Sequence, residues 1–335
     1  FTNMIEYQIG KKLLRRNMSR LLYVVHRYAP FPGGSENYVR DMAEETLSRG
    51  HEVSVFAGEH KGDWNGVRVS SDPQILLENW DLIVVHGGDV ALQNFVLANS
   101  GRIPSPILFM LIIPSESDIY KHALHYCKYI GCSTKEDWFY AHQQGIMQKA
   151  KQVTHGIDPK ISVGRPGFRE KYGIKTELMF LSCGGYWHNK RMMELVNLFN
   201  QVGRYDITLV TTGYDNRFGI KPEDSEFVKN LMIPVRDDVM SAIREADLYI
   251  MHSDREGFGL VLLESMLNKT PWAAKNMAGA RLMSEHGFTY NNDEELLKYM
   301  KEFKPVMQDK IDSAYEFVTT THMISNTVDD ILRLV

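Results

Sequence analysis

The feature that most constrains this chain is a regular alternation of short apolar runs with longer segments of helical periodicity. Two of the runs, 80–86 (WDLIVVH) and 107–113 (ILFMLII), are almost continuously apolar. Runs of this kind are typical of strands that helices cover on both faces, because neither face meets water. Helix-like segments such as 35–49 and 134–144 supply that cover. The alternation therefore predicts an α/β fold with parallel sheets and helices on both sides.

A segment rich in glycine, proline and charge, residues 155–174, interrupts this alternation, which then restarts. Two doubly wound, Rossmann-like units of a common domain size are implied. We expect a basic extension over 1–18, a first domain over 19–160, a second over 161–315 and a C-terminal helix over 316–335 that returns to the first domain. In such sheets ligands bind at the carboxyl ends of the strands. The predicted active site is therefore a central cleft that the two domains face.

Composition and charge narrow the classes of function. The 335 residues are 44% hydrophobic and 24% charged with a net charge of −4, which is typical of a soluble globular protein. Nothing in this balance indicates a nucleic-acid partner. The three cysteines are too few and too irregularly spaced for a disulfide framework, which indicates a reducing compartment. No apolar run approaches the ~20 residues that span a bilayer, so we expect a cytoplasmic protein.

The N-terminal region is the strongest local concentration of charge. Residues 11–20 carry five lysines and arginines, two leucines and no acid. A segment of this kind can lie on the anionic inner face of a membrane. Two leucines give little apolar area, however, so a solvated basic tail is the competing interpretation.

A cluster of histidines and cysteines suggests a metal site, but the spacing of these residues does not fit one. His122, His125, Cys127 and Cys132 lie within eleven residues. Their spacing matches no zinc pattern, and the segment equally resembles a helix that runs into a strand. We therefore expect neither a metal nor a cofactor.

The strongest chemical signal follows the predicted strand that ends at Met251. Gly257 and Gly259 flank the start of the next helix, where backbone can approach a ligand and unpaired N–H groups attract a phosphate. Glu256 stands just before this helix, and Glu264 lies more than a turn inside it. Two carboxylates so placed can hold two hydroxyl-bearing parts of one ligand. Alternatively, they are a first-turn acid and an exposed glutamate of an ordinary helix.

The segment 182–191 (SCGGYWHNKR) also runs from a strand through glycines into a helix. Lys190 and Arg191 near that helix start can neutralise a pyrophosphate. The competing interpretation is a solvated basic pair, which the helix dipole slightly disfavours at this end.

The segment 30–36 (PFPGGSE) is a third strand-to-helix loop. Gly33 and Gly34 can approach the same phosphates from the first domain. In the competing interpretation, Ser35 simply caps the helix that follows, and the two roles are compatible.

Together these segments resemble family 4 of the retaining GT-B glycosyltransferases (glycosyl transferases group 1). The resemblance rests first on EGFG at 256–259, a helix with a second glutamate eight residues after the first, and then Thr-Pro at 270–271. GGSE at 33–36 resembles the family's first-domain Gly-Gly-x-Glu loop, and HGID at 155–158 resembles its Asn-Gly-Val-Asp. Gly-Ala at 279–280 resembles the family's Gly-Gly stretch. The matching segments extend over nearly the whole chain.

The resemblance implies transfer of a sugar from a nucleoside diphosphate-sugar, with UDP as the default, to a glycan, lipid or other acceptor. It implies retention at the anomeric carbon and no need for a metal, and the sequence has no Asp-x-Asp motif. Glu256 would bind hydroxyls of the transferred sugar, Glu264 the ribose, and Lys190 the β-phosphate. The implied donor-binding residues are Gly33, Gly34, Gly185, Arg191, Gly257, Phe258, Gly259, Leu260 and Glu264.

Three positions depart from the family pattern. Gly185 occupies the place of an arginine, so we expect Arg191 to supply the second phosphate cation. The usual histidine of the first domain is missing, and His86 is the best remaining catalytic candidate, with a polar strand terminus as the alternative. His155 replaces an asparagine.

Two rival functions remain. Gly185 and the missing histidine are compatible with a protein that binds nucleotide-sugars without turnover. A Rossmann oxidoreductase is the second rival, although no Gly-x-Gly-x-x-Gly follows the first strand.

Overall fold

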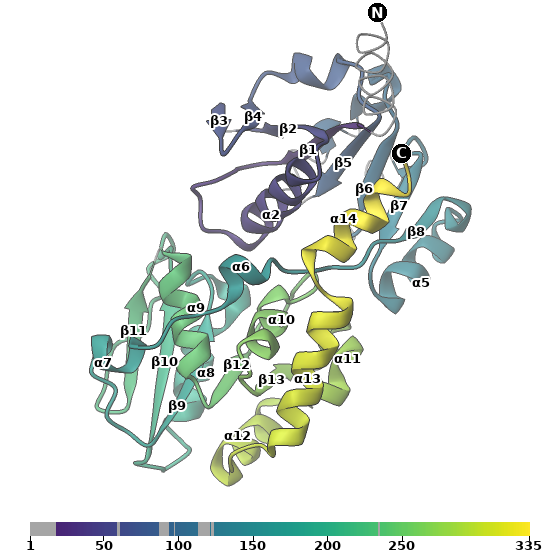
Figure 1. The fold of residues 1–335 in the computed structure, drawn as a ribbon. Helices are drawn as coiled ribbons and strands as arrows, with labels where there is room; N and C mark the ends of the chain where they lie inside the picture. The colour runs from purple at the N-terminus through teal and green to yellow at the C-terminus, as the bar shows by residue number, and fades with distance from the viewer. Residues whose placement is uncertain are drawn as a thin grey trace, which may run out of the picture. The chain divides into compact units, whose positions relative to one another are not determined.

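The computed structural model describes residues 18–58, 61–86, 94–96, 98–112, 121, 124–233 and 235–335. The chain forms two compact units, each with its own parallel sheet (Figure 1). Of the described residues, the first unit holds those from 18 to 133 together with 137–153 and 327–335, and the second holds those in 134–136 and 154–326. The parallel α/β fold class predicted from the alternation is confirmed.

The sheet of the first unit has the strand order β3-β4-β2-β1-β5-β6-β7-β8. All neighbours are parallel except β3 and β4, which are antiparallel. The strands are β1 (Arg20–Val25), β2 (Glu52–Ala57), β3 (Gly62–Trp64), β4 (Val67–Ser70), β5 (Leu82–His86), β6 (Ile107–Met110), β7 (Tyr129–Cys132) and β8 (Ala150–Gln152).

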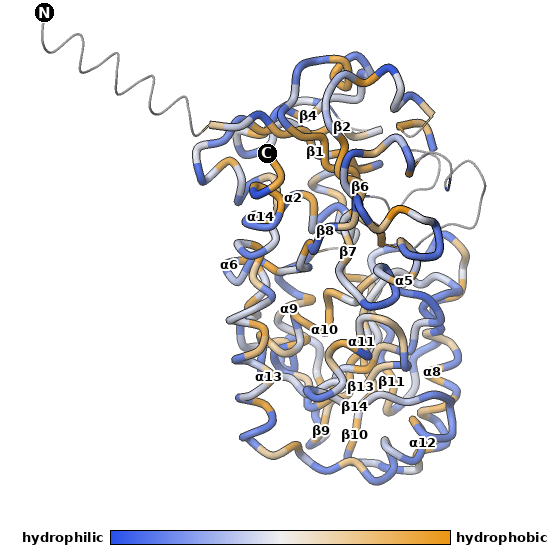
Figure 2. Tube along the Cα trace, turned by 90° about the vertical axis from the view of Figure 1, so that its right-hand side faces the viewer, coloured by the Kyte–Doolittle hydropathy of each residue, from blue (hydrophilic) through white to orange (hydrophobic). Residues whose placement is uncertain are grey.

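Strands β1 and β2 are buried after their first residue and are mostly hydrophobic (Figure 2), because both of their faces are covered. Helix α2 (Gly34–Ser48) packs against both strands. Tyr38, Met42 and Thr46 recur every four residues on its buried face. The Thr46 hydroxyl lies 2.7 Å from the buried Tyr23 hydroxyl on β1, so the polar groups at this contact are paired. Helix α5 (Lys135–Gln143) follows β7.

The sheet of the second unit has six parallel strands in the order β11-β10-β9-β12-β13-β14. Its strands are β9 (Leu178–Cys183), β10 (Ile207–Gly213), β11 (Val228–Met232), β12 (Leu248–Met251), β13 (Trp272–Lys275) and β14 (Phe288–Tyr290). Its helices are α6 (Pro159–Ser162), α7 (Phe168–Tyr172), α8 (Met192–Phe199), α9 (Arg236–Glu245), α10 (Leu260–Leu267), α11 (Ala278–Leu282), α12 (Asp293–Glu302) and α13 (Gln308–Thr321).

The chain reverses its direction of winding once in each sheet. In the second sheet the reversal falls between β9 and β12, and in the first sheet it falls between β1 and β5. At such a point the loops from two neighbouring strands turn to opposite faces and leave a crevice between them. These reversals therefore locate the two places where a ligand is expected.

The end of the chain differs from the single helix expected over 316–335. It forms α13 and a separate helix α14 (Ile324–Leu332). Between them, His322 accepts a backbone hydrogen bond from Ile157, and Ile157 accepts one from Ile324, each of 2.9 Å. Gly156 lets the segments approach this closely, because a Cβ there would lie 2.2 Å from the Met323 carbonyl oxygen. The same pairing draws residues 154–160 into the second unit, so the division falls after residue 153 rather than after 160.

The basic extension expected over 1–18 lies outside the described residues except for Met18. Within the described ranges, no helix is both long enough and apolar enough to cross a membrane.

Candidate functional site

The two loops with the strongest sequence signals meet at the reversal point of the second sheet. The β9 loop (residues 184–191) and the β12 loop (residues 252–259) follow the carboxyl ends of two hydrogen-bonded strands. The backbone N–H of Asp254 donates a 2.8 Å hydrogen bond to the carbonyl of Asn189, which ties the loops together. The structure thus brings both motifs to the place where open α/β sheets bind ligands.

Lys190 and Glu256 form an ion pair across these loops. Nζ of Lys190 lies 2.5 Å from Oε1 of Glu256, and the side chains are only 19% and 17% exposed. Gly184 lies under the lysine stem, since a Cβ there would be 3.4 Å from the Lys190 Cε. A cation and a carboxylate therefore stand together at this point, little exposed to solvent.

Gly259 forms the N-terminal cap of α10. Its φ of 87° lies in the left-handed region that favours glycine, and a Cβ there would come within 3.2 Å of the Met251 Cε. No side chain caps this helix end. The first amide groups of α10, from Leu260 onward, can therefore bind an anion at the positive end of the helix dipole.

Phe258 is a buried residue of the β12 loop and is held from two sides. Its ring stacks on the ring of His155, with centroids 4.6 Å apart and planes 8° apart. Its carbonyl oxygen lies where a side chain of residue 279 would be. A Cβ on Gly279 would come within 1.7 Å of this oxygen, so only glycine fits there. His155, which replaces an asparagine in the resembled pattern, thus packs against the loop, and Gly279 is required for the loop's position.

Glu264 has a partner that the sequence did not reveal. Nη2 of Arg236, at the start of α9, lies 3.0 Å from Oε1 of Glu264, and these side chains are 13% and 15% exposed. The same nitrogen donates to the Ser162 hydroxyl at 2.9 Å. The guanidinium thus orients the carboxylate that the resemblance assigns to the ribose.

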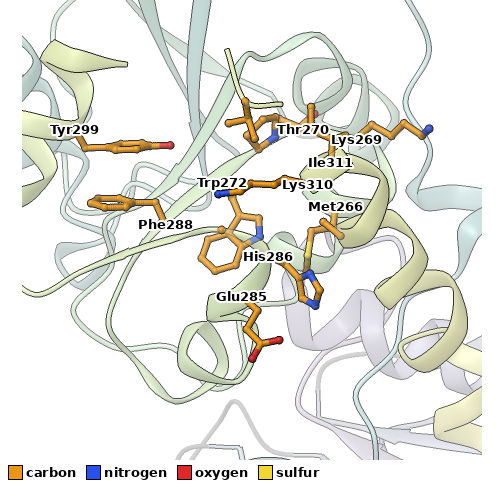
Figure 3. A pocket seen from close by; sticks show the side chains of 14 residues that line it. Met266, Lys269, Thr270, Trp272, Glu285, His286, Phe288, Tyr299, Lys310 and Ile311 are labelled. Atoms are coloured by element: carbon orange, nitrogen blue, oxygen red, sulfur yellow. The ribbon is translucent and has the colours of Figure 1, made fainter. Parts of the chain in front are cut away.

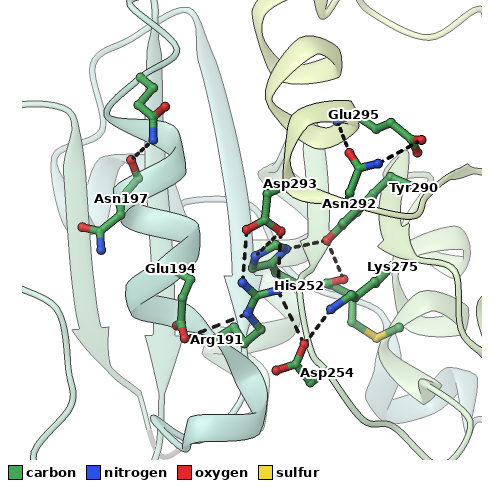
Figure 4. A network of polar contacts seen from close by, with 12 residues as sticks. Arg191, Glu194, Asn197, His252, Asp254, Lys275, Tyr290, Asn292, Asp293 and Glu295 are labelled. Atoms are coloured by element: carbon green, nitrogen blue, oxygen red, sulfur yellow. Dashed lines mark hydrogen bonds and ion pairs between the residues drawn. The ribbon is translucent and has the colours of Figure 1, made fainter.

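Arg191 lies among carboxylates (Figure 4). Its Nη2 and Nη1 contact the two oxygens of Asp293 at 3.1 and 3.4 Å, and Nη1 also lies 3.5 Å from Asp254. Asp293 is in the first turn of α12. The guanidinium therefore links the β9 loop to α12 and to the β12 loop, and its expected role as a phosphate cation remains a prediction.

His252 and Lys275 extend this polar network. Nδ1 of His252 lies 2.8 Å from the Tyr290 hydroxyl, and its Nε2 lies 3.5 Å from Asp293. Burial lowers the pKa of His252 to about 4, so the imidazole is neutral at neutral pH. Nζ of Lys275 lies 2.6 Å from Asp254. The network thus ties two side chains of the β12 loop, His252 and Asp254, to the surrounding strands and to α12.

The remaining glycines of the predicted site have different surroundings. A Cβ on Gly185 would lie 2.6 Å from the Trp187 ring, so this glycine makes room for an indole. Gly257 and Leu260 stand on either side of Phe258 and Gly259 in the β12 loop and the start of α10.

In the first unit, Gly33 and Gly34 lie where β1 leads into α2. A Cβ on Gly33 would come within 2.1 Å of the Glu36 carboxylate, which folds back over the glycine. Glu36 is 4% exposed, and Nε of Arg27 lies 3.3 Å from it. Both glycines thus stand beside the reversal point of the first sheet, and their expected approach to phosphates remains a prediction.

His86 ends β5, the neighbour of β1 at that reversal point. It is 4% exposed, and its ring centroid lies 5.1 Å from that of Tyr38. Burial lowers its pKa to about 4. The residue is therefore a neutral, buried imidazole, and its catalytic role remains a prediction.

The cluster considered for metal binding is only partly described, because His122 lies outside the described residues. Burial raises the pKa of Cys127 and of Cys132 to about 12, which disfavours their thiolate forms. Among the residues that the structure describes, no three histidine, cysteine or acidic side chains converge as metal ligands do.

Comparison with known proteins shows which families and folds this chain resembles. Residues 165–304 match the model of the family "Glycosyl transferases group 1". A curated relative, the N-acetyl-alpha-D-glucosaminyl L-malate synthase of Bacillus anthracis, is 29% identical over 130 residues, which are 36% of this chain and 33% of that protein. The match thus spans about a third of the length of that relative.

Two solved structures have the same fold over almost their whole length. Anabaena Alr3699/HepE in complex with UDP-glucose superposes with a TM-score of 0.73 at 16% identity, over 94% of this chain and 98% of that one. Sucrose-phosphate synthase from Thermosynechococcus elongatus gives a TM-score of 0.75 at 16% identity with the same coverage. Residues 165–304 are therefore similar to the glycosyl transferases group 1 family, and the chain has the GT-B fold.

Proposed function

We propose that this chain is a glycosyltransferase that moves a sugar from a nucleoside diphosphate-sugar, by default a UDP-sugar, to a glycan or lipid acceptor. The observation that carries the proposal is the Lys190–Glu256 pair beside the N-terminus of α10. The names of the similar proteins support it, since one is an N-acetyl-alpha-D-glucosaminyl L-malate synthase and another was solved with UDP-glucose.

In the proposed reaction, the bond between the anomeric carbon and the diphosphate oxygen breaks. The acceptor hydroxyl bonds to the same carbon with retention of configuration, and its proton leaves with the diphosphate. Lys190 and the first amides of α10 stabilise the charge that develops on the leaving group. These groups supply the positive potential, so we propose that the reaction needs no metal.

Glu256 accepts hydrogen bonds from the hydroxyls of the transferred sugar, and Glu264, oriented by Arg236, accepts them from the ribose. Lys190 and Glu256 contact each other in this structure. A donor must therefore exchange their mutual hydrogen bond for one from Lys190 to phosphate and one from a sugar hydroxyl to Glu256. Each of these is charge-assisted, which compensates for the pair that is lost.

We also propose that the protein acts in the cytoplasm. The basic N-terminal segment would bring it to the inner face of a membrane if the acceptor is a lipid. Sedimentation with anionic vesicles, with and without residues 1–17, tests this part.

The main test begins with thermal unfolding in the presence of UDP-, GDP- and ADP-sugars. A ligand at about 100 times its dissociation constant stabilises the folded state by roughly 2.7 kcal/mol. The stabilising donor is then assayed for release of the nucleoside diphosphate with candidate acceptors, with and without EDTA, and the anomeric configuration of the product is read by NMR.

Release that depends on Lys190, tested as Lys190→Ala against Lys301→Ala as a distant control, would support the proposal. Stabilisation by a donor without any turnover would instead identify the rival function, a nucleotide-sugar-binding protein. Complete loss of activity in EDTA, restored by manganese, would refute the metal-independent mechanism.

A further inference from the structure

The second unit contains a cavity at the edge of the sheet opposite the β9 and β12 loops. Its volume is about 200 Å³. It lies at the amino ends of β13 and β14, next to α12 and α13 (Figure 3). In a parallel sheet the amino and carboxyl ends of the strands lie on opposite edges, so this cavity is separate from the proposed donor site.

Aromatic rings form fixed walls of the cavity. The rings of Phe288 and Tyr299 stack with centroids 3.9 Å apart and planes 7° apart. Trp272 is 1% exposed, and its ring rests on the backbone at Gly287, where a Cβ would come within 2.2 Å of it. The walls are therefore formed before any ligand binds, which lowers the entropic cost of binding.

Two lysines and one carboxylate, that of Glu285, lie around the cavity. Lys269 is already paired with Asp312 at 2.9 Å. Lys310 also lines the cavity, and no carboxylate in the described ranges pairs with its ammonium. Within the same part of the chain, the buried Nε1 of Trp272 has no hydrogen-bond acceptor. An acceptor atom near this wall would therefore meet an ammonium group and an indole N–H that has no partner.

We propose that this cavity binds a small carboxylate with a ring-sized apolar body. The apolar body would pack against Trp272 and Phe288, and the carboxylate would pair with Lys310. A protein cavity of about 150 Å³ holds benzene, so this volume accommodates one ring with one substituent. Apolar walls with a few polar groups that fix orientation are the usual composition of small-molecule sites.

The test is calorimetric titration of the full chain with benzoate and with its neutral counterpart benzyl alcohol, each in the presence of saturating UDP. Lys310→Gln should weaken benzoate about tenfold and leave benzyl alcohol unchanged, because only the carboxylate uses the ammonium. Lys301→Gln, on the neighbouring helix α12 and not in the cavity wall, should change neither affinity.

Ala314→Leu, which adds three carbons to the α13 wall, should abolish the binding of both probes. Its melting temperature shows whether it folds, and Met266→Phe fills the cavity from α10 if it does not. The proposal is refuted if neither probe binds at millimolar concentration, or if UDP displaces benzoate. It is also refuted if benzoate binds the Lys310→Gln and filled variants as it binds wild type. None of these measurements depends on sugar transfer by the chain.

Discussion

Replacement of Arg191 distinguishes a structural link from a donor-binding cation. The residue has a φ of 52°, in the left-handed region, and its guanidinium contacts Asp293 through two nitrogens. Arg191→Ala removes the contacts and keeps the unfavourable backbone conformation, whereas Arg191→Gly removes the contacts and also relieves the conformation. The two variants therefore separate the two contributions to the free energy of unfolding.

The expected changes in the free energy of unfolding follow from the contacts and the backbone conformation of Arg191. Hydrogen bonds to charged groups contribute about 1.5–3 kcal/mol, but the Asp293 side chain is 43% exposed, so solvent screening reduces the expected loss to about 1 kcal/mol. A non-glycine residue in the left-handed region costs about 1–2 kcal/mol. Arg191→Ala should therefore lower the free energy of unfolding by about 1 kcal/mol, and Arg191→Gly should remain close to wild type.

The assay combines urea unfolding with turnover, and Asp293→Asn is the matched partner variant. If Arg191 is a structural link, the Arg191→Ala and Asp293→Asn effects on stability should be non-additive in a double-mutant cycle, and turnover should fall less than tenfold. If Arg191 instead binds the diphosphate, turnover should fall about 100-fold in both Arg191 variants, with additive effects on stability. This second outcome would refute the structural role.

Three further perturbations test the rest of the site. Glu256→Gln should lower turnover by roughly 10- to 100-fold, equivalent to about 1.5–3 kcal/mol, while the melting temperature stays near wild type; near-normal turnover would remove this residue from the site. Burial lowers the pKa of His252 to about 4, below the value near 6.5 of the unfolded chain, so the unfolded state takes up its proton first as the pH falls. The free energy of unfolding should therefore decline between about pH 6.5 and 4, by at most about 3 kcal/mol from this residue, and urea titrations of His252→Asn should show a shallower decline. Gly279→Ala should displace the Phe258 carbonyl at a cost of about 1–3 kcal/mol and weaken donor affinity, whereas Gly101→Ala, whose Cβ would meet nothing within 4 Å, should do neither.

The fold was predictable where apolar residues ran without interruption. Strands such as β1 and β5, buried on both faces, stand out in the sequence because nearly every position is apolar. The edge strands β3 and β14 were not predicted, since each has three residues and partly exposed side chains. The break between α13 and α14 was also missed, because a distant segment at Ile157 imposes it and the local sequence remains helical in pattern.

The candidate site was predictable where its chemistry is local. The β9 and β12 loops each carry their glycines and charges within a few residues, so their position after a strand could be predicted from the sequence. The residues that pair with these loops could not be predicted in this way. Asp293 and Arg236 come from helices remote in sequence, and only the pairing of β9 with β12 and the packing of α9 and α12 bring them to the site. The left-handed backbone of Arg191 likewise has no signal in the sequence.

Gly185 departs from the family pattern, and Arg191, which was expected to supply the missing cation, is paired with carboxylates. Any side chain at residue 185 would meet the Trp187 ring, since a Cβ alone would lie 2.6 Å from it. Trp187 is itself held by an edge contact with Tyr214, with centroids 5.7 Å apart. An aromatic pair thus stands beside the position of the family's arginine, while Arg191 is directed to carboxylates. Lys190 is therefore the side-chain cation of these loops that contacts Glu256, and we infer that the N-terminus of α10 supplies the rest of the positive potential for the diphosphate.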